Sequence, residues 1–337
     1  MDKLNVAIVG ATGAVGTAMR RLIDERRFPA GDIRLLASSR SAGRRFTVGG
    51  RSRTVEILDD FDFTGTQLAL FSTGGGISLE HAPRAAAAGA IVIDNTSAFR
   101  QKADIPLVVP EVNGHRIADG IGPNIIANPN CVAIPLTVAC KPIYDAVGID
   151  RINVATYQSV SGAGASGVRE LEDQTQQAVR GDPIDGFPVH PAQMAFNVIS
   201  HAWTMGEDGF SDEETKVVNE TRKILEDDDL GVNPTCVRVP VYYGHSMAVH
   251  VETRDAISPT QARDLLRSAP GVVLVEGDEA PTAVEHAAGR DGVFVGRVRR
   301  DPSHERGLDL WVVSDNVRKG AALNSIQIAE EVGELIG

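Results

Sequence analysis

The sequence predicts an α/β protein with two domains: an N-terminal Rossmann-type, doubly wound parallel sheet, and an α+β domain with a mostly antiparallel sheet. Three observations support this fold class. A chain of 337 residues, 42% of them hydrophobic, is long enough to fill two cores. Before about residue 130, near-continuous apolar strands alternate with helices, which is typical of a parallel sheet covered on both faces. Beyond that point, strands alternate apolar and polar residues, as half-exposed antiparallel strands do.

The first domain begins with a short apolar run that ends at Gly10 and leads into a helical pattern. Val15, Met19, Leu22 and Ile23 recur at the spacing of one helix face. The elements expected in order are strand 4–9, helix 14–26, strands 33–37 and 67–71, helix 78–88 and strand 90–93. This alternation predicts the doubly wound sheet.

The second domain is marked by strands of period two. They are expected at 152–160, 235–241, 247–253, 272–275 and 308–314. A last amphipathic helix, at 321–336, is expected to return to the first domain. The expected domains are therefore residues 1–129 together with 320–337, and residues 130–319.

Composition excludes several classes of protein. No apolar run approaches the length of a membrane span, and the first strand starts too early to leave room for a signal peptide. Three cysteines in unrelated contexts favour reduced thiols in a cytoplasm over disulfides or a metal site. A net charge of −12 argues against nucleic-acid binding, although a few local arginines would still hold a small anion.

A glycine-rich loop follows the first strand. Gly10, Gly13 and Gly16 allow a tight turn and the close approach of a pyrophosphate to the backbone at a helix N-terminus. The loop follows a strand and opens a helix, which is the context that a dinucleotide site requires. The alternative is an ordinary strand–turn–helix connection.

The end of the second strand indicates which dinucleotide binds. An NAD site usually has an acidic residue there, whereas this chain has Ser38, Ser39 and Arg40, with Arg44 close behind. A positive, hydroxyl-rich corner fits a 2′-phosphate, so the expected cofactor is NADP. The alternative is a solvated basic loop.

Cys131 is the candidate nucleophile. Asn128-Pro129-Asn130 interrupts the apolar strand that precedes it, and a helix is expected to begin at Cys131 itself. A helix N-terminus favours the thiolate over the thiol. Cys140, inside the helix, and Cys236, inside a strand, are expected to be packing residues. A dinucleotide site followed by an activated cysteine predicts covalent redox chemistry on an aldehyde or acyl group.

Eight histidines compete for the role of acid/base partner. His245 follows a strand and lies in a Gly-His-Ser turn that would present it to a cleft. His250 is expected to be bound within the next strand. Four others are expected at the surface and two have no clear framing element: His81, His115, His286 and His304, then His190 and His201.

Two arginines are candidates for anion binding. Arg238 shares a strand face with Cys236, and the valines of the opposite face are expected to form the core. Arg100 ends the segment after strand 90–93, where open α/β sheets bind ligands. A structural ion pair is the alternative for each arginine.

A capping box at Ser211–Glu214 starts a helix near Asp212 and puts Glu213 and Lys216 on one face of its first turn. By its spacing alone, this pair is expected to be solvent-exposed.

The chain also carries several longer motifs in a fixed order. They are Gly-Ala-Thr-Gly-Ala-Val-Gly at 10–16, Ala-Ser-Ser-Arg at 37–40, Asp-Asn-Thr-Ser-Ala-Phe-Arg at 94–100, Pro-Glu-Val-Asn at 110–113, Asn-Pro-Asn-Cys at 128–131, Tyr-Gln-Ser-Val-Ser-Gly-Ala-Gly at 157–164, Glu-Glu-Thr-Lys at 213–216, Cys-Val-Arg-Val-Pro-Val at 236–241 and Gly-His-Ser at 244–246.

Together these motifs resemble aspartate-semialdehyde dehydrogenase, nearly from end to end. The resemblance implies that Cys131 is the nucleophile, that His245 is the acid/base, and that Gln158 orients the reacting group. It implies a catalytic and dimerisation role for the second domain, and a homodimer as the assembly.

The resemblance also implies the substrate contacts. Arg238 and Glu213 would hold the amino-acid end, while Arg100, Lys216 and Asn130 would hold phosphate. This reverses the expectation of an exposed Glu213–Lys216 pair. The cofactor-binding residues expected from the loops and the resemblance are Gly10, Ala11, Thr12, Gly13, Ala14, Val15, Ser38, Ser39, Arg40, Ser72, Gly74, Ser161, Gly162 and Asn324.

The implied reaction is the reversible, NADP-dependent conversion of L-aspartate 4-semialdehyde and phosphate to 4-phospho-L-aspartate through a Cys131 thioester. In the reverse direction it would feed lysine, threonine and methionine synthesis. One alternative is an N-acetyl-glutamyl-phosphate reductase, whose motif resembles Asn-Pro-Gly-Cys-Tyr-Pro-Thr rather than the Asn-Pro-Asn-Cys found here. Another is an inactive paralogue that serves as an interaction module.

Overall fold

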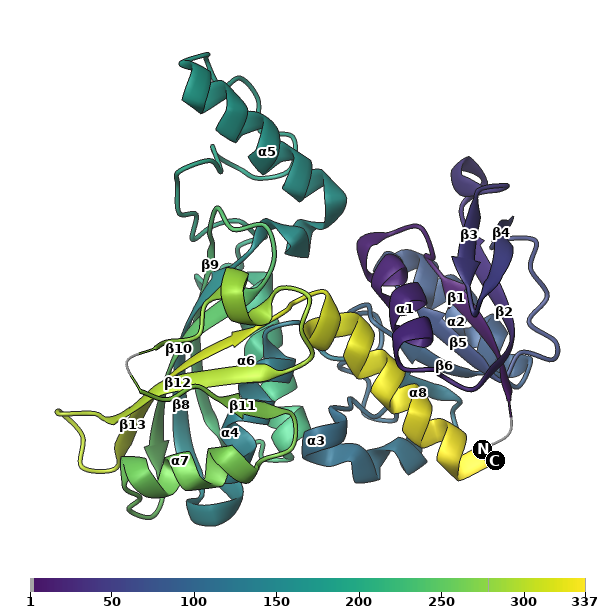
Figure 1. Cartoon of the computed structure of the whole chain (residues 1–337). Helices are drawn as coiled ribbons and strands as arrows, with labels where there is room; N and C mark the ends of the chain where they lie inside the picture. Colours follow the sequence, from purple (N-terminus) through teal and green to yellow (C-terminus); the bar gives the residue numbers. More distant parts are fainter. Residues whose placement is uncertain (1–2, 278, 337) are drawn as a thin grey trace. The chain divides into compact units, whose positions relative to one another are not determined.

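A computed structural model describes residues 3–277 and 279–336. The chain folds into two compact units, the first comprising Met1–Asn130 and Ala321–Gly337 and the second Cys131–Gly320. The predicted α/β fold class is confirmed, with a mainly parallel sheet in one unit and a mainly antiparallel sheet in the other (Figure 1). Among the described residues, no helix is long and apolar enough to cross a membrane.

In the first unit, the described residues form a seven-stranded sheet in the order β3-β4-β2-β1-β5-β6-β7. Its strands are β1 (Leu4–Val9), β2 (Ala30–Ala37), β3 (Arg45–Val48), β4 (Arg51–Ile57), β5 (Leu68–Phe71), β6 (Ile91–Asp94) and β7 (Ile125–Ala127). All neighbours are parallel except β3 and β4. The helices are α1 (Ala14–Glu25), α2 (Gly75–Ala87), α3 (Pro110–Asn113) and α8 (Leu323–Ile336).

Both faces of this sheet are buried. Successive residues of a strand point to opposite faces, and in the central strands the residues on both faces are buried. Ile8 and Leu35 face a core that also contains side chains of α1 and α8, as Met19 and Ile326 show. Val9 and Leu36 point to the other face and are also fully buried. Figure 1 shows α1 and α8 in front of the strands and α2 behind them. The last helix, α8, lies in the first unit and packs into its core.

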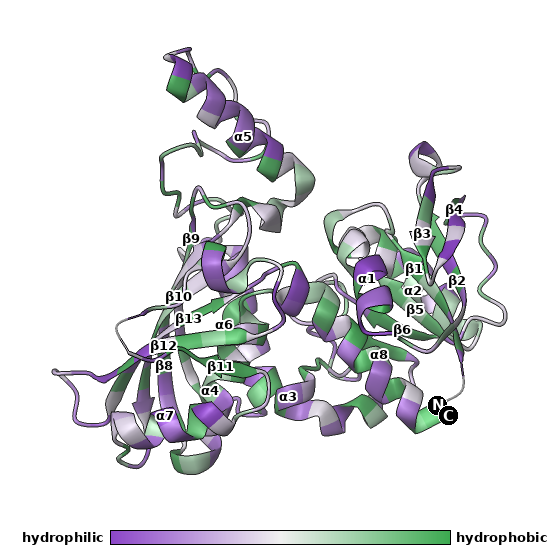
Figure 2. Cartoon of the chain, in the orientation of Figure 1, coloured by the Kyte–Doolittle hydropathy of each residue, from purple (hydrophilic) through white to green (hydrophobic). Residues whose placement is uncertain are grey.

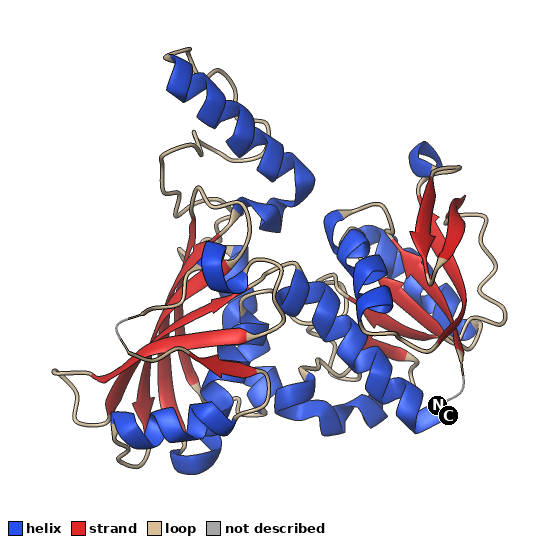
Figure 3. Cartoon of the chain, in the orientation of Figure 1, coloured by secondary structure: helices blue, strands red, loops and turns tan. Residues whose placement is uncertain are grey.

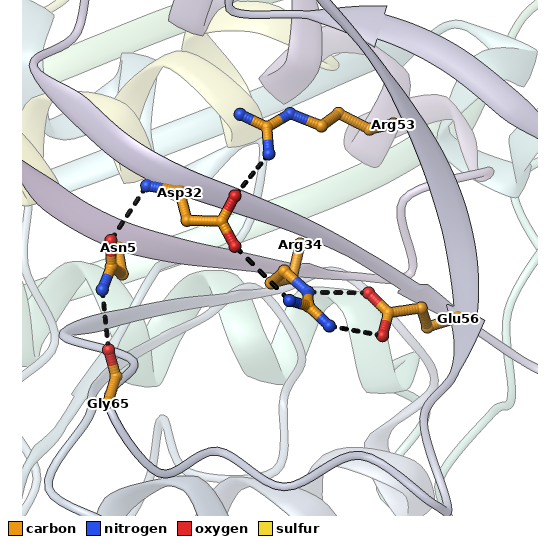
Figure 4. Close-up of polar contacts among 6 residues, drawn as sticks. All are labelled: Asn5, Asp32, Arg34, Arg53, Glu56 and Gly65. Carbon is orange, nitrogen blue, oxygen red and sulfur yellow. Dashed lines mark hydrogen bonds and ion pairs between the residues drawn. The ribbon is translucent and has the colours of Figure 1, made fainter.

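The hairpin β3–β4 was not predicted from the sequence. Its strands are short and rich in arginine and threonine, so they carry little apolar signal. Charged side chains join the hairpin to β2 (Figure 4): Arg34 donates two hydrogen bonds to Glu56, of 2.8 and 2.7 Å, and Asp32 pairs with Arg53. This exposed network connects β4 to the first half of β2.

In the second unit, the described residues form a six-stranded sheet in the order β11-β12-β13-β10-β8-β9. Its strands are β8 (Ile149–Gln158), β9 (Gly231–Arg238), β10 (His245–Thr253), β11 (Val272–Leu274), β12 (Val293–Arg300) and β13 (Gly307–Ser314). The pairs β8–β9 and β11–β12 are parallel and the others antiparallel. Strand β12 was not predicted.

The helices of this unit are α4 (Ala133–Val147), α5 (Gly164–Arg180), α6 (Asp212–Leu225) and α7 (Pro259–Ser268). Helix α4 contacts both α6 and α7, and these three helices form a layer beside the strands (Figure 3). Helix α5 lies apart from the sheet and is mainly hydrophilic, whereas the strands are mainly hydrophobic (Figure 2). A small separate core, which includes Leu171 and Met194, joins α5 to the segment that follows it.

Candidate active site

The glycine loop between β1 and α1 has the geometry of an anion site. Gly10 has φ +83°, and a Cβ there would lie 2.5 Å from the backbone oxygen of Ser72, so only glycine fits. Gly13 is the N-cap of α1, and no side chain caps this helix. The first N–H groups of α1 therefore lack a side-chain acceptor, which fits the pyrophosphate of a dinucleotide.

The other residues expected to bind the cofactor in this unit follow neighbouring strands. Ser38, Ser39 and Arg40 are exposed in a short 3₁₀ turn after β2. The Thr12 hydroxyl of the glycine loop lies 3.4 Å from that of Ser41, so loop and turn adjoin. Of the other members of the set, Ala11 lies in the glycine loop and Ala14 and Val15 are the first residues of α1. Ser72 and Gly74 follow β5, and Gly74 is the N-cap of α2, which has no side-chain cap.

Arg100 and Asn324 are both buried and hold the interior of the first unit together. Arg100 donates to the backbone oxygens of Asn128, at 2.9 Å, and Asn95, at 2.7 Å. The Asn324 amide donates to the Val108 oxygen at 2.9 Å and to the Asn128 side chain at 2.7 Å. Asn130 is buried as well. Their expected contacts with phosphate or cofactor remain predictions.

Cys131 and His245 form a pair in the second unit. The sulfur Sγ lies 3.4 Å from Nε2 of the imidazole. Helix α4 begins at Ala133 with Val132 as its N-cap, so the prediction that it begins at Cys131 was wrong by two residues. Cys131 instead lies in the turn before the helix, partly exposed, where its sulfur reaches the histidine.

His245 is the first residue of β10 and is completely buried. Its Nδ1 accepts a hydrogen bond from the Ser159 backbone N–H at 3.0 Å. Burial and the nearby Arg238 guanidinium hold the pKa of His245 well below its ordinary value. A buried, neutral imidazole beside a thiol is suited to proton transfer near pH 7.

Arg238, at the end of β9, lies in the same unit, and its pKa is lowered by burial. Its Nη1 donates to the Ser159 oxygen at 2.7 Å, and its guanidinium lies 4.6 Å from the centre of the Trp203 ring. Its Nε is buried without a hydrogen-bond partner among the described residues. A buried guanidinium N–H without an acceptor is what a carboxylate ligand would satisfy.

Gly162 makes room for this guanidinium, because a Cβ at that position would lie 2.8 Å from Nη1 of Arg238. The face with Val237, Val239 and Val241 was predicted to be the core. This is wrong within β9, although Val239, just beyond the strand, is buried. Cys236 and Arg238 are buried instead, since Glu214 of α6 accepts a 2.8 Å hydrogen bond from the Cys236 backbone and holds that helix on their side. Val237 is only half-buried.

Gln158, Glu213 and Lys216 form a connected chain. The Gln158 amide donates to Glu213 at 3.1 Å, and the Lys216 ammonium lies 3.6 Å from the same carboxylate. Gln158 and Glu213 are buried, so the expectation of an exposed pair, drawn from spacing alone, was wrong for Glu213. The capping box at Ser211 and Glu214 is confirmed.

Among the remaining histidines, His81 was predicted to be at the surface, and this is wrong. It is buried, with Nδ1 2.8 Å from the Arg84 guanidinium and Nε2 3.4 Å from Asp59. His190 is buried beside Glu170. The others are exposed or half-buried: His115, His201, His250, His286 and His304. Among the described residues, no group of three His, Cys, Asp or Glu side chains could hold a metal ion.

Three residues near the histidine–arginine site were missed from the sequence: Ser159, Asn316 and Trp203. Ser159 directly follows β8 and Asn316 lies two residues beyond β13. Asn316 lies just past the strand predicted at 308–314, whereas Ser159 lay inside the strand predicted at 152–160, and only the pairing of the strands brings both to His245. Trp203 lies in a polar segment outside helix and strand and gave no signal in the sequence.

Two family models match this chain. Residues 5–120 match the semialdehyde dehydrogenase NAD binding domain, and residues 140–319 match the semialdehyde dehydrogenase dimerisation domain. The glycine loop lies in the residues that match the NAD binding domain. His245, which contacts Cys131, lies in the residues that match the dimerisation domain. Fold and site thus define the class as a semialdehyde dehydrogenase with an NAD-binding domain.

Comparison with individual proteins shows which family of semialdehyde dehydrogenases the chain belongs to. Aspartate-semialdehyde dehydrogenase 2 of Vibrio cholerae is 53% identical over 329 residues, which span 98% of this chain and 97% of that protein. The Bacillus subtilis enzyme is 45% identical over 342 residues, with 98% of each covered. The crystal structure of aspartate semialdehyde dehydrogenase II of Vibrio cholerae complexed with ASA has a TM-score of 0.98, 52% identity and full coverage of both chains. The chain belongs to the aspartate-semialdehyde dehydrogenase family.

Proposed function

We propose that this enzyme converts L-aspartate 4-semialdehyde, phosphate and NADP reversibly to 4-phospho-L-aspartate and NADPH through a thioester on Cys131. The observation that carries the proposal is the Cys131–His245 pair, with Sγ 3.4 Å from Nε2. A thiol and a neutral imidazole at that separation are the parts that covalent aldehyde oxidation requires. The relative solved with ASA supports the choice of substrate.

The protein groups would act as follows. The Cys131 thiolate, formed as its proton passes to His245, attacks the aldehyde carbon, and the protonated imidazole returns that proton to the oxygen to give a thiohemiacetal. His245 takes the hydroxyl proton as the carbon loses hydride, and the product is a thioester. A phosphate oxygen then attacks the thioester carbon, the C–S bond breaks and the Cys131 thiolate leaves. Gln158 would orient the reacting carbonyl group.

Arg238 and Glu213 would hold the amino-acid end of the substrate. The buried Arg238 guanidinium has an unpartnered Nε for the α-carboxylate, and Glu213 carries a negative charge suited to the α-ammonium group. Arg100, Lys216 and Asn130 would hold phosphate. Because guanidinium and carboxylate are both desolvated, their contacts with substrate would be strong and selective.

The cofactor proposed is NADP, which when bound would accept the hydride. The glycine loop at Gly10 and Gly13 would hold its pyrophosphate on the N-terminus of α1. Ser38, Ser39 and Arg40 would hold its 2′-phosphate, because their exposed hydroxyl and guanidinium groups follow β2 where an acid would serve NAD. The other expected contacts are Thr12, Ser72, Gly74, Ser161, Gly162 and Asn324.

In the cell, the reverse direction would feed the biosynthesis of diaminopimelate and lysine, of threonine and of methionine.

The proposed assembly is a homodimer. The match to a dimerisation domain supports it, as does the sheet face turned away from α6, where Tyr157 is 38% exposed beside Trp311 at 5.6 Å between ring centroids. Aromatic residues on an open sheet face are suited to an interface.

The test is an assay of NADPH formation from aspartate semialdehyde with and without phosphate. N-acetyl-glutamate semialdehyde and a simple aldehyde serve as competing substrates, and NAD replaces NADP in a parallel series. We expect turnover that requires phosphate and is fastest with aspartate semialdehyde and NADP. Phosphate-independent oxidation to the free acid, or a preference for N-acetyl-glutamate semialdehyde, would refute the proposal.

A further inference from the structure

Three strand ends meet at His245. The sheet order places β10 between β13 and β8, both antiparallel to it. In this register His245 is opposite Ser314, the last residue of β13, and Ser246 is opposite Tyr157, near the end of β8. The chain therefore leaves β8 and β13 at the point where β10 begins, and the residues just beyond those two ends, Ser159 and Asn316, reach the imidazole and each other.

The Nδ1 atom of His245 lies next to two groups of Ser159. The backbone N–H donates to it at 3.0 Å, and the hydroxyl Oγ lies 3.1 Å away. That hydroxyl donates its own proton to Oδ1 of Asn316 at 3.0 Å. Both side chains are buried, so water does not compete for these bonds.

Asn316 is itself held in one orientation. Its Oδ1 also accepts from the Gly244 N–H, at 3.0 Å, and from the Ser161 hydroxyl, at 3.1 Å. Its Nδ2 donates to the Ser161 hydroxyl at 3.0 Å. Since the amide oxygen is surrounded by donors, it keeps the Ser159 O–H directed toward itself and leaves the lone pairs of that oxygen to the imidazole.

The imidazole can carry its proton on either nitrogen. Burial and the adjacent Arg238 guanidinium favour the neutral ring, which has one proton. The fixed Ser159 N–H favours Nδ1 as an acceptor and so puts that proton on Nε2, which faces Cys131. An Nε2 that already carries the proton has no free lone pair and cannot accept another proton. To act as a base toward the substrate, the ring must hold its proton on Nδ1 and must find an acceptor there.

We propose that Ser159 and Asn316 are positioning residues that set the tautomer of His245. The Ser159 hydroxyl, oriented by Asn316, accepts a hydrogen bond from Nδ1–H and so leaves the Nε2 lone pair free to take a proton from the reacting group. The Ser159 N–H and hydroxyl stabilise opposite tautomers. In the Nδ1–H tautomer, Nε2 takes the substrate proton, the ring becomes the cation with Nδ1–H still bonded to the Ser159 hydroxyl, and Nε2 returns the proton in the reverse direction. This inference rests on the proposed acid/base role of His245. A wrong tautomer in an otherwise intact site can cost orders of magnitude in rate.

The test compares Ser159→Ala, which removes the acceptor, with Ser159→Thr, which keeps a hydroxyl. The matched control is Ser314→Ala, because the Ser314 hydroxyl is buried next to His245 in the sheet yet has no hydrogen-bond partner among the described residues. We expect Ser159→Ala to lower kcat by about 10- to 100-fold, within the range that a general base contributes. The KM values for aspartate semialdehyde and NADP should change little, Ser159→Thr should restore much of kcat, and Ser314→Ala should match the unaltered enzyme.

A second variant examines the orienting group. Asn316→Ala should lower kcat in the same way, and the double variant Ser159→Ala/Asn316→Ala should be no slower than the slower single variant, because both changes remove one function. Unchanged kcat in Ser159→Ala, or losses that multiply in the double variant, would overturn the inference. The variant His245→Asn tests the acid/base role separately from the positioning role. If His245→Asn is inactive while Ser159→Ala keeps its activity, only the positioning role of Ser159 is refuted. If His245→Asn is active, the acid/base role of His245 is refuted.

Discussion

At the scale of single residues, the three cysteine thiols differ mainly in their surroundings. Cys140 is fully buried in α4, and desolvation raises the pKa of its thiol to about 12. Burial also raises the pKa of Cys236, and the nearby carboxylates of Glu213 and Glu214 act in the same direction. Both therefore stay protonated and unreactive at neutral pH. Cys131 is partly exposed and has an imidazole at 3.4 Å, which leaves it as the thiol able to react.

We predict that Cys131→Ser abolishes phosphate-dependent NADPH formation while the fold and NADP binding are retained. A hydroxyl is a far weaker nucleophile than a thiolate, so the first covalent step fails. Cys140→Ala and Cys236→Ala serve as controls and should keep most activity. Steady-state rates and cofactor titration measure the outcome. Selective alkylation of Cys131 with no loss of turnover would show that no thioester forms.

Arg238 is proposed to bind the α-carboxylate of the substrate, so a substitution there tests substrate recognition separately from the reactivity of the Cys131 thiol. Its guanidinium is fixed by the Ser159 oxygen, the Trp203 ring and the close approach of Gly162. A cation held this rigidly offers parallel N–H groups to a carboxylate, whereas the ammonium of a lysine would be a point charge on a flexible stem.

The substitution Arg238→Lys should therefore lower kcat/KM for aspartate semialdehyde by on the order of 100-fold, because a displaced substrate holds its aldehyde badly toward Cys131. NADP affinity and the rate of Cys131 alkylation should stay nearly unchanged. A simple aldehyde without an α-carboxylate provides the comparison and should be affected little. Equal losses for both aldehydes, or an unfolded variant, would mean that Arg238 has a structural role instead.

At the scale of elements, helix α6 positions Glu213 and Lys216, which we propose as substrate contacts. Its capping box fixes the first turn: the Ser211 hydroxyl accepts from the Glu214 N–H at 3.3 Å, and Glu214 accepts from the Ser211 N–H at 2.7 Å. The same carboxylate binds the backbone of β9 at Cys236. The turn that carries Glu213 is thereby attached to the strand that ends at Arg238.

The capping box predicts a stability difference. Ser211→Ala should reduce the free energy of unfolding by about 1–2 kcal/mol, because the cap is lost and a buried N–H loses its acceptor. The control is Ser258→Ala in the capping box of α7, which is less buried and should cost about 0.5–1 kcal/mol. Denaturant unfolding of both variants measures the difference. Equal losses of unfolding free energy in the two variants would mean that the burial of the Ser211 cap adds no stability.

At the scale of the whole molecule, the first unit contains both ends of the described chain. Side chains of α8, such as Ile326 and Val332, share a core with β1 and α1. The unit that carries the glycine loop is therefore complete only when the last helix is in place. A ligand bound to this unit stabilises the folded enzyme by mass action.

Cofactor choice can be measured through this stabilisation. Saturating NADP should raise the melting temperature, and Arg40→Ala should reduce that rise because NADP binding weakens by roughly 1.5–3 kcal/mol, the scale of a charged hydrogen bond. The shift caused by NAD should change much less. Arg40 is exposed, so the melting temperature without cofactor should be nearly unaltered. Equal weakening of both cofactors would exclude a 2′-phosphate contact at Arg40.

Several elements could be predicted because their signal is local. Strand β1, the loop at Gly10 and the start of α6 each depend on a short run of residue types and were predicted with the right position. The hairpin β3–β4 could not, because arginine and threonine on an edge strand carry no apolar period. The buried face of β9 was assigned to the wrong side, since valine lay opposite arginine and only the position of α6 decided the matter.

The sequence by itself determined the α/β class, the order of most strands and helices, the glycine loop, and the identity of Cys131, His245 and Arg238 as candidates. These depend on residue type and spacing along the chain. The tertiary structure alone decided that Cys131 precedes its helix, and that Glu213 is buried against Gln158. It alone joined Ser159 and Asn316, 157 residues apart, around one imidazole. Such contacts depend on strand register and helix packing, which bring together residues whose spacing along the chain carries no sign of the contact.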